Sequence, residues 1–332
     1  MSTSTILVIT HSRDLHAKRV IGILRSRGAA VHALDYGRFP ADTDISIVFD
    51  EEPIHALIRL PKGEVLDSRS VSAVYHRRPH SPKLRQGVSS SALRDYIAKE
   101  SQGVLDALPH AIPVFWLCHP GKVAAAACKP WQLVLAHQLG FSIPGTLISN
   151  SVAKVREFAN QYRFLAVKTL QSPGIEFGQG GNRGQFALFT RRISSGSVRR
   201  HAKDAGNCPT VFEEYVEKAF ELRITVVGDR VFSCAMYTQQ SKKTREDFRR
   251  YDLKNTKHEA FQLPIEVEAR CRQLVKRLGL HFGCIDMIVD KEGRYHFLEV
   301  NPSGQWLWTE DLAELPISRA IANILLHPPV VE

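Results

Sequence analysis

Features that would place a chain in a membrane, secretory or zinc-binding class are missing from this sequence of 332 residues. No apolar run approaches the roughly 20 residues that span a bilayer, and the first residues lack the charged and apolar regions of a signal peptide. The six cysteines form no Cys-x-x-Cys pair and the histidines form no His-Glu-x-x-His pattern, which favours free, mostly buried thiols. We therefore expect a cytoplasmic protein with no membrane contact.

A nucleic-acid-binding signature is also missing, although the formal net charge is +10. Such a charge invites a nucleic-acid interpretation, yet the basic pairs are scattered and form no basic tail. An anionic nucleotide and an acidic peptide substrate would explain the charge as well, so we expect no nucleic-acid partner. With 44% hydrophobic residues, a chain of this length can bury a sizeable core and suggests two or three domains or lobes.

The chain opens with the pattern of an α/β domain. Residues 5–10 are apolar and β-branched, residues 15–27 have helical spacing, and residues 30–34 favour a second strand. This unit has no Gly-x-Gly-x-x-Gly motif, so a dinucleotide site is not expected. Further along, residues 222–237 predict a hairpin around a Gly-Asp turn, and the charged residues 241–259 are typical of a functional or disordered loop.

The most informative segment is a pair of apolar runs near the C-terminus, separated by a turn that contains glycine. They cover residues 283–289 and 295–302. The pattern predicts a β-hairpin, and because strand side chains alternate between faces, Glu299 and Asn301 should share a face with Tyr295 and Phe297. Strand pairing can bring Asp286 beside Glu299. Two carboxylates and an amide oxygen suit Mg²⁺; the plain alternative is two surface acids and a turn asparagine.

Other charged residues precede this hairpin in a definite order. Lys168 ends an apolar run, and a lysine in a buried strand is costly unless it meets an anion. An acidic stretch, 213–221, follows at the end of a strand whose exposed backbone groups could read an adenine edge, and Arg223 comes next within another strand. The order of these features resembles the ATP-grasp fold: a lysine for phosphate, an acidic hinge, a strand with an arginine, and then the Asp…Glu-x-Asn hairpin.

The resemblance narrows to the graspetide synthetases, the RimK-like ATP-grasp maturases of microviridin-type ribosomal peptides. It runs over nearly the whole chain and rests on the segments Val74-Tyr75-His76-Arg77-Arg78-Pro79, 129–146, 247–252 and 299–308. In the family a tryptophan tends to precede Arg-Arg-Pro, and residues 172–185 have no obvious counterpart. The resemblance implies an α/β chain with the ATP-grasp fold. Its expected parts are an N-terminal pre-ATP-grasp domain (1–120), a central lobe with a linker helix (121–205) and a C-terminal lobe with the Mg-ATP site (206–332).

The same resemblance implies roles for individual residues. The Mg²⁺ ligands would be Asp286, Glu299 and Asn301. The ATP contacts would be Lys129 and Lys168 at the phosphates, Glu213 with the backbone of Tyr215 and Val216 at adenine, and Glu221 at the ribose. The groups around the reacting carboxylate would be Arg223, which offsets phosphoryl charge, Arg249 and Arg250, which contact an acidic peptide, and Asp247, which orients an arginine or assists the nucleophile. The glycine-rich residues 178–184 either close over phosphates or form a plain mobile loop.

The reaction implied is an ATP-dependent ligation that passes through an acyl phosphate. In graspetide synthetases a side-chain carboxylate of a ribosomal precursor peptide, which consists of a leader and an acidic core, is joined to a Ser or Thr hydroxyl as an ω-ester or to a Lys amine as an ω-amide. One alternative is a RimK-like carboxylate–amine ligase that acts on a small acid or a protein C-terminus. Another is a non-catalytic nucleotide- or nucleic-acid-binding protein. The resemblance also suggests a homodimer.

Overall fold

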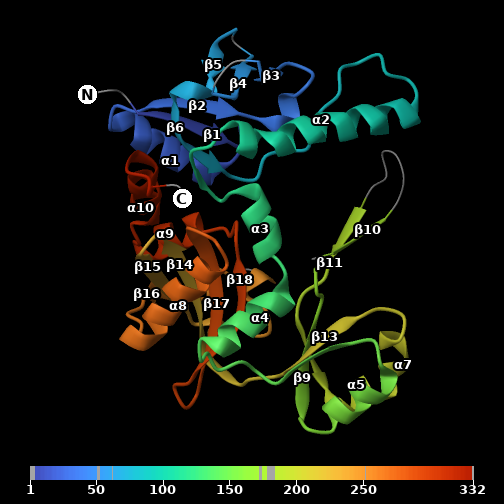
Figure 1. Cartoon of the computed structure of the whole chain (residues 1–332). Coiled ribbons are helices and arrows are strands. Elements are labelled where there is room, and N and C mark those ends of the chain that lie inside the picture. The colour runs from blue at the N-terminus through green and yellow to red at the C-terminus, as the bar shows by residue number, and fades with distance from the viewer. Residues whose placement is uncertain are drawn as a thin grey trace.

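The computed structural model describes residues 4–50, 53–61, 63–171, 174–177, 184–250 and 252–330. Within these ranges, the side chains of residues 175–177, 184–187 and 249 are not described. Helices and sheets alternate through three parts, which Figure 1 shows as an upper N-terminal domain and two lower lobes. The predicted α/β class is confirmed.

The N-terminal domain is built on a parallel sheet in the order β2-β1-β6-β7. The predicted first βαβ unit is present, and Asp14 starts its helix by accepting from the backbone N–H groups of His16 and Ala17. Gly28, at φ 82°, follows the end of the helix. An antiparallel sheet, β3-β4-β5, and a long helix complete the domain. Its elements are β1 (Thr5–Ile9), α1 (Leu15–Ser26), β2 (Ala30–Leu34), η1 (Tyr36–Arg38), β3 (Asp44–Val48), β4 (His55–Arg59), β5 (Val65–Asp67), η2 (Ser68–Ser70), β6 (Val71–His76), α2 (Ser91–Ala111) and β7 (Phe115–Leu117).

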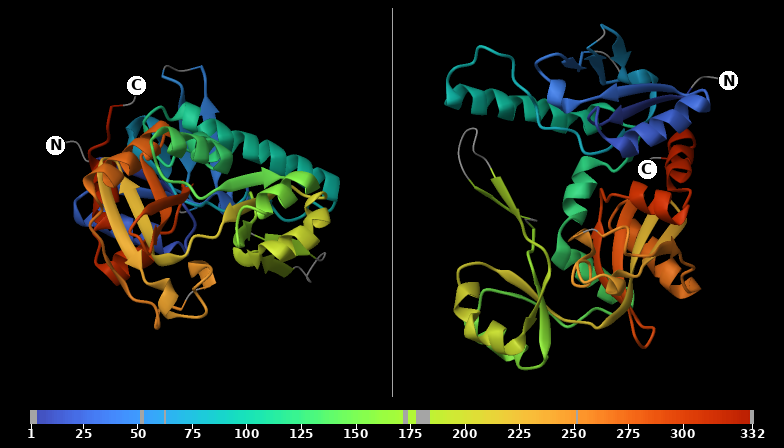
Figure 2. Two further views of the ribbon diagram at one scale, coloured as in Figure 1. Left: turned by 90° about the horizontal axis from the view of Figure 1, so that it is seen from below. Right: turned by 180° about the vertical axis from the view of Figure 1, so that it is seen from behind.

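The central lobe is an antiparallel sheet in the order β12-β9-β13-β8, covered by short helices. It has its own core, in which Val155 and Ala159 of the first helix pack with Leu165 and Phe212 of the sheet. A separate hairpin of β10 and β11 extends from the lobe on the side of the N-terminal domain (Figures 1 and 2). The elements are β8 (Thr146–Ser149), α5 (Val152–Ala159), β9 (Phe164–Lys168), β10 (Gly174–Phe177), β11 (Gly184–Ala187), β12 (Arg191–Ser194), α6 (Ser195–Arg200), α7 (Ala202–Ala205) and β13 (Thr210–Glu214).

The C-terminal lobe is an antiparallel sheet in the order β16-β15-β14-β17-β18. The hairpins predicted over 222–237 and 283–302 are its β14–β15 and β17–β18 pairs. The charged segment 241–259 contains the single turn η4 and the start of the edge strand β16, and the single turn η3 comes just before it. The elements are β14 (Lys218–Val227), β15 (Arg230–Met236), η3 (Thr238–Gln240), η4 (Phe248–Arg250), β16 (His258–Ala260), α8 (Ile265–Arg277), β17 (Phe282–Asp290), β18 (Tyr295–Asn301), α9 (Leu307–Ala313) and α10 (Ile317–Leu326).

Two expected lobe boundaries differ from the structure. Strand β13 lies beyond residue 205 but pairs with β8 and β9, so it belongs to the central sheet. The linker helices α3 (Pro120–Ala126) and α4 (Lys129–Gln138) pack on the C-terminal lobe, where Ala126 and Leu135 share a core with Leu222 and Leu274. Pairing and packing between distant segments decide both boundaries, and a linear pattern does not contain that information.

The N-terminal domain and the C-terminal lobe share one continuous core. Ile6 and Tyr75 of the N-terminal sheet pack with Trp306 and with Ile321 of α10. Helices α1 and α10 lie side by side in this contact (Figure 1). The central lobe has a core of its own and is joined to the other two parts through the segments around residues 139–145 and 215–217. In the parts of the chain described, no helix is long and apolar enough to cross a membrane.

Candidate active site

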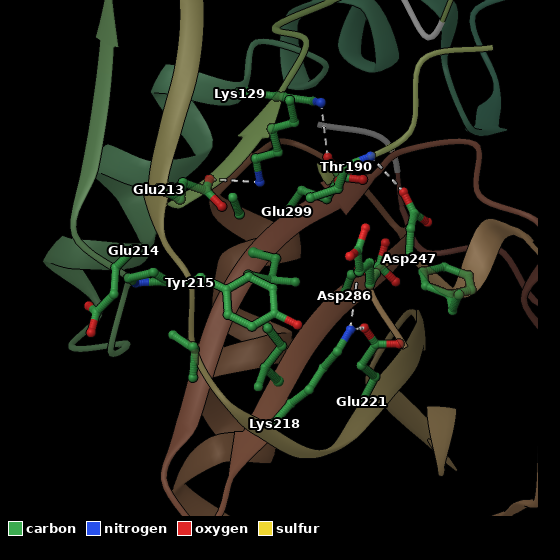
Figure 3. Close-up of a pocket in the computed structure, with 18 of the residues that line it drawn as sticks. Lys129, Thr190, Glu213, Glu214, Tyr215, Lys218, Glu221, Asp247, Asp286 and Glu299 are labelled. Carbon is green, nitrogen blue, oxygen red and sulfur yellow. Dashed lines mark hydrogen bonds and ion pairs between the residues drawn. The ribbon is translucent and has the colours of Figure 1, made fainter. Parts of the chain in front are cut away.

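A cleft lies where the central sheet faces the C-terminal sheet, with the start of α4 closing one side. Strands β9 and β13 supply one wall, and β14, β17 and β18 supply the other (Figure 3). Nine of the thirteen predicted site residues line it: Lys129, Lys168, Glu213, Tyr215, Val216, Glu221, Asp247, Asp286 and Glu299.

Two lysines mark one end of the cleft. The Lys168 ammonium, at the end of β9, lies 2.7 Å from Oε1 of Glu213 on the neighbouring strand, and both side chains are largely buried. The Lys129 ammonium, at the first turn of α4, lies 3.1 Å from Oε2 of Glu299 and 3.4 Å from the backbone oxygen of Thr169. The two cations therefore approach the cleft from different lobes, an arrangement suited to a polyanionic ligand.

The segment between β13 and β14 forms the apolar end of the cleft. Tyr215 and Val216 line it from this segment, and Ile288 and Leu298 line it from the opposite sheet. Apolar walls beside exposed backbone groups fit a flat heteroaromatic ring. The sequence pattern predicts the hinge residues but not Ile288 or Leu298, since both look like ordinary strand residues.

A buried ion pair lies deeper in the cleft. Lys218 and Glu221, at the start of β14, contact each other with side-chain exposures of 4% and 8% (Figure 3). Burial raises the pKa of Glu221, and the Lys218 ammonium opposes that shift. Lys218 is not among the residues predicted for the site. The available signal was a lysine three residues before an acid in a segment that otherwise reads as a strand.

The predicted magnesium ligands lie together on β17 and β18. Asp286 pairs with Glu299 in the register of the two strands, and the Asn301 side-chain amide donates to Oδ2 of Asp286 at 3.0 Å and to Oε1 of Glu299 at 3.4 Å. An N–H group thus points between two carboxylates. Among the described residues no cluster of three or more His, Cys, Asp or Glu side chains could hold a metal, so a metal here would have two carboxylates and an amide oxygen. These hard oxygen donors fit Mg²⁺, which keeps several positions for water or phosphate.

A β-bulge makes one part of the predicted strand geometry wrong. The register shifts between Asp286 and Met287, so Glu299 pairs with Asp286 while Phe297 pairs with Met287, and Leu298 is the extra residue. Phe297 is fully buried in the hydrophobic core, whereas Leu298 and Glu299 line the cleft. Simple alternation had placed Phe297, with Tyr295, on the face of Glu299. Because of the bulge, the side chains before Leu298 and those after it no longer follow one alternating pattern, so Phe297 and Glu299 lie on opposite faces of the sheet.

Arg223 lies behind the predicted metal ligands. It does not line the cleft; its Nη1 donates to Oδ1 of Asp286 at 2.7 Å and its Nη2 donates to the backbone oxygen of Gln305 at 3.0 Å. Burial lowers the pKa of this guanidinium, but the Asp286 carboxylate more than offsets burial and raises it. Arg223 therefore stays charged and fixes the orientation of Asp286.

The three remaining predicted residues belong to the loop around η4. Asp247 is buried in the cleft wall, and its Oδ2 accepts from the backbone N–H of Thr190 at 2.9 Å. The Arg250 guanidinium lies 5.5 Å from the ring centre of Phe189 and 4.0 Å from the Glu246 carboxylate, outside the cleft lining. The side chain of Arg249 lies outside the description, as do residues 178–183 of the glycine-rich segment.

Comparison with known proteins shows which class of protein this chain resembles. Residues 5–123 match a family model described as the MvdD pre-ATP grasp domain. The chain is 25% identical to rat (Rattus norvegicus) mitochondrial pyruvate carboxylase over 191 residues. This aligned stretch covers 55% of this chain and 16% of the carboxylase. The chain thus spans about a sixth of the length of the curated relative that it matches.

Similar solved structures extend over the whole chain. The macrocyclase MdnC from Microcystis aeruginosa MRC, bound with precursor peptide MdnA, has a TM-score of 0.83 and 31% identity, over 97% of this chain and 99% of that one. A Chryseobacterium gregarium RiPP-associated ATP-grasp ligase, in complex with ADP and a leader and core peptide, has a TM-score of 0.88 and 25% identity, over 99% and 98%. The M. aeruginosa macrocyclase MdnB has a TM-score of 0.77 and 28% identity, over 97% and 99%.

Fold and likeness together define an ATP-grasp ligase, with the cleft between its two lobes. The chain belongs to the graspetide family of these ligases, the macrocyclases of ribosomal peptides.

Proposed function

We propose that this ligase binds ATP with Mg²⁺ and closes ω-ester or ω-amide rings in a ribosomal precursor peptide, between Asp or Glu carboxylates and Ser, Thr or Lys side chains. The observation that supports it best is the cleft itself, which gathers two lysines from different lobes around a set of hard oxygen ligands. Two of the similar structures contain a bound peptide, a precursor peptide in one and a leader and core peptide in the other. We further propose a cytoplasmic site of action, and the homodimer stays a prediction from resemblance.

The residues of the cleft fit a magnesium nucleotide. Asp286, Glu299 and Asn301 would hold the metal, and Lys129 and Lys168 would hold phosphate oxygens. The hinge backbone would meet the adenine edge. Glu213, which faces Lys168, would be available for the amino group of adenine when that lysine turns to phosphate. Glu221, which is paired with Lys218, would accept from the ribose hydroxyl groups.

The protein has little covalent chemistry to perform in such a reaction, since positioning and charge neutralisation carry most of it. When bound, ATP supplies the phosphoryl group that converts a peptide carboxylate into an acyl phosphate, which is a far better acyl donor. Arg223 holds Asp286 in place and keeps positive charge behind it. The Lys129 ammonium lies against Glu299, where it counters charge at the edge of the same site. Asp247 is fixed by the Thr190 N–H at the cleft wall, where it can orient a cation or accept a proton from the attacking group.

A peptide substrate rich in acids would need cations at the mouth of the cleft. Arg249 and Arg250 belong to the loop that contributes Glu246, Asp247 and Phe248 to the cleft lining. We assign them to the core peptide, because Arg250 is near the cleft wall without lining the cleft itself. The RimK-like and non-catalytic alternatives are not favoured, since the similar macrocyclases extend over nearly the whole chain.

The test is a reconstitution with a short acidic peptide encoded next to the gene of this ligase. Purified protein, peptide, ATP and Mg²⁺ should give peptide products lighter by one or more waters, whereas the Lys168→Met variant should give none. A matched surface change, Lys203→Met on α7, should leave the products unchanged, since Lys203 is exposed and distant from the cleft lining. Unmodified peptide with the native ligase, or modification without ATP, would refute the proposal.

A further inference from the structure

One charged side chain of the N-terminal domain is buried where that domain meets the C-terminal lobe. Arg77 follows the end of β6 and is 1% exposed, and it is among the largest fully buried side chains of the described residues. Its Nη1 donates to the backbone oxygen of Ser303 at 2.7 Å. Its Nε lies 3.7 Å from Oδ2 of Asp14, an ion pair too long for a hydrogen bond. Burying a charge is costly unless it is paired and hydrogen-bonded, so this contact is an expensive feature of the interface.

The acceptor of that bond is part of the turn that follows the metal-ligand strand. Ser303 is two residues after Asn301, and the turn is closed by a hydrogen bond from the Gly304 N–H to the backbone oxygen of Asn301 at 3.1 Å. The backbone oxygen of Gln305, two residues further on, accepts a hydrogen bond from Nη2 of Arg223 at 3.0 Å. Arg223 in turn holds Asp286. One short turn therefore connects Arg77 to two of the three proposed metal ligands.

The turn has little freedom to move without changing these contacts. A Cβ atom on Gly304 would lie 2.4 Å from Cβ of Cys284 and 2.8 Å from Nη2 of Arg223. Cys284 is fully buried in β17, the strand that carries Asp286. The turn is thus pressed onto the strand from one side and held from the other by the Arg77 guanidinium, with a longer hydrogen bond of 3.2 Å from Nε of the exposed Arg78 to the same Ser303 oxygen.

We infer that Arg77 is a positioning residue for the magnesium site: through the Ser303 carbonyl, the N-terminal domain fixes the turn that orients Asn301 and supports Arg223. This inference rests on the proposed function. It gives the N-terminal domain a direct part in the ligation, although none of the described residues that line the cleft comes from that domain. Groups that orient metal ligands usually matter nearly as much as the ligands themselves.

The test compares Arg77→Lys with a change elsewhere in the same interface. Lysine keeps the positive charge, but its single ammonium cannot reproduce the planar fork of arginine. The first readout is Mn²⁺ binding in the presence of ADP, followed by the electron paramagnetic resonance signal of free Mn²⁺. We expect the Mn²⁺ dissociation constant of Arg77→Lys to rise about 10- to 100-fold, with metal-free ADP affinity within about twofold of the native value. The control is Ile321→Val, in the shared core but away from the turn; it should lower the melting temperature and leave Mn²⁺ affinity unchanged.

The outcomes separate positioning from bulk stability. Native Mn²⁺ affinity in folded Arg77→Lys overturns the inference, as does an equal loss of affinity in Ile321→Val. If Arg77→Lys does not fold, Asp14→Asn decides, because asparagine can still cap α1 but no longer pairs with Arg77: a weaker Mn²⁺ affinity supports the inference and an unchanged one overturns it. If the native protein itself binds no Mn²⁺ with ADP, the proposed function fails and the inference falls with it.

Discussion

Gly304 offers the sharpest test of the packing behind the proposed metal site. In Gly304→Ala the new methyl carbon would lie 2.4 Å from Cβ of Cys284 and 2.6 Å from its sulfur, whereas non-bonded carbon atoms prefer about 3.5–4.0 Å. Cys284 is in an interior strand of the sheet, so we expect the turn to move by about 1 Å or more. The Gln305 oxygen would then leave Arg223.

The expected cost follows from two terms. Overpacking a tight site costs about 1–3 kcal/mol, and a hydrogen bond to a charged group contributes about 1.5–3 kcal/mol. Together they predict a loss of about 2.5–6 kcal/mol in the free energy of unfolding, a large part of the roughly 5–15 kcal/mol that holds a typical domain together. The backbone of Gly304 has no left-handed φ, so the cost arises from the contact rather than from backbone strain.

Urea unfolding measures the loss in the free energy of unfolding of Gly304→Ala, with Gly283→Ala as the matched control. A Cβ at Gly283 would meet Val275 and Val300 methyl groups at 3.2 Å, a contact that small shifts relieve, so a loss of about 1 kcal/mol or less is expected. The double variant Gly304→Ala/Cys284→Gly removes the atoms that clash and should be less unstable than the sum of its single changes. Equal stability of the two glycine variants, or strict additivity in the double variant, would refute the reasoning.

Three further predictions concern the metal, the substrate and pH. Glu299→Gln and Asn301→Ala should each abolish turnover at ordinary Mg²⁺ concentration while the circular dichroism spectrum stays native, because the first removes the charge of a carboxylate ligand and the second removes the amide oxygen; near-normal peptide modification by either variant would exclude the assignment. Arg250→Ala should impair peptide modification more than ATP binding, whereas the exposed Lys254→Ala should change neither; equal loss of both properties would move Arg250 to the nucleotide. Burial lowers the pKa of His76 to about 4 from its ordinary 6.5, so the native state resists protonation, and the stability present above pH 6.5 should fall by about 2 kcal/mol by pH 5. In urea titrations the His76→Phe variant should lack this loss of stability between pH 6.5 and pH 5. An identical dependence of stability on pH in the variant and the native protein would contradict the prediction.

Local patterns predict the C-terminal hairpin well. Its apolar runs and glycine turn are local features, and the pairing of Asp286 with Glu299 follows once the strands are drawn together. The β-bulge at Leu298 could not be predicted from the same residues. Tyr295, Phe297 and Glu299 alternate perfectly in the sequence, and only packing of Phe297 into the core shows that the alternation is broken.

The cleft was less accessible to sequence reasoning than the hairpin. Part of its assignment comes from family resemblance, which supplied Lys129, and chemistry alone does not single that residue out. The burial of Lys218 beside Glu221 is seen only in the folded lobe. Trp306 stood out as a motif residue, yet it is fully buried between the N-terminal domain and the C-terminal lobe. Contacts between segments some two hundred residues apart, such as Arg77 with Ser303, have no local signature.

The most direct test of the central claim is the nucleotide balance of the reaction. With its cognate precursor and Mg²⁺, the ligase should release one ADP and one phosphate for each water lost from the peptide, because activation passes through an acyl phosphate. Nucleotide products resolved by anion-exchange chromatography, beside peptide masses from the same samples, give this ratio. AMP and pyrophosphate would mean adenylation, and ADP release without any loss of water would mean that the peptide is not the acyl donor; either result would contradict the account.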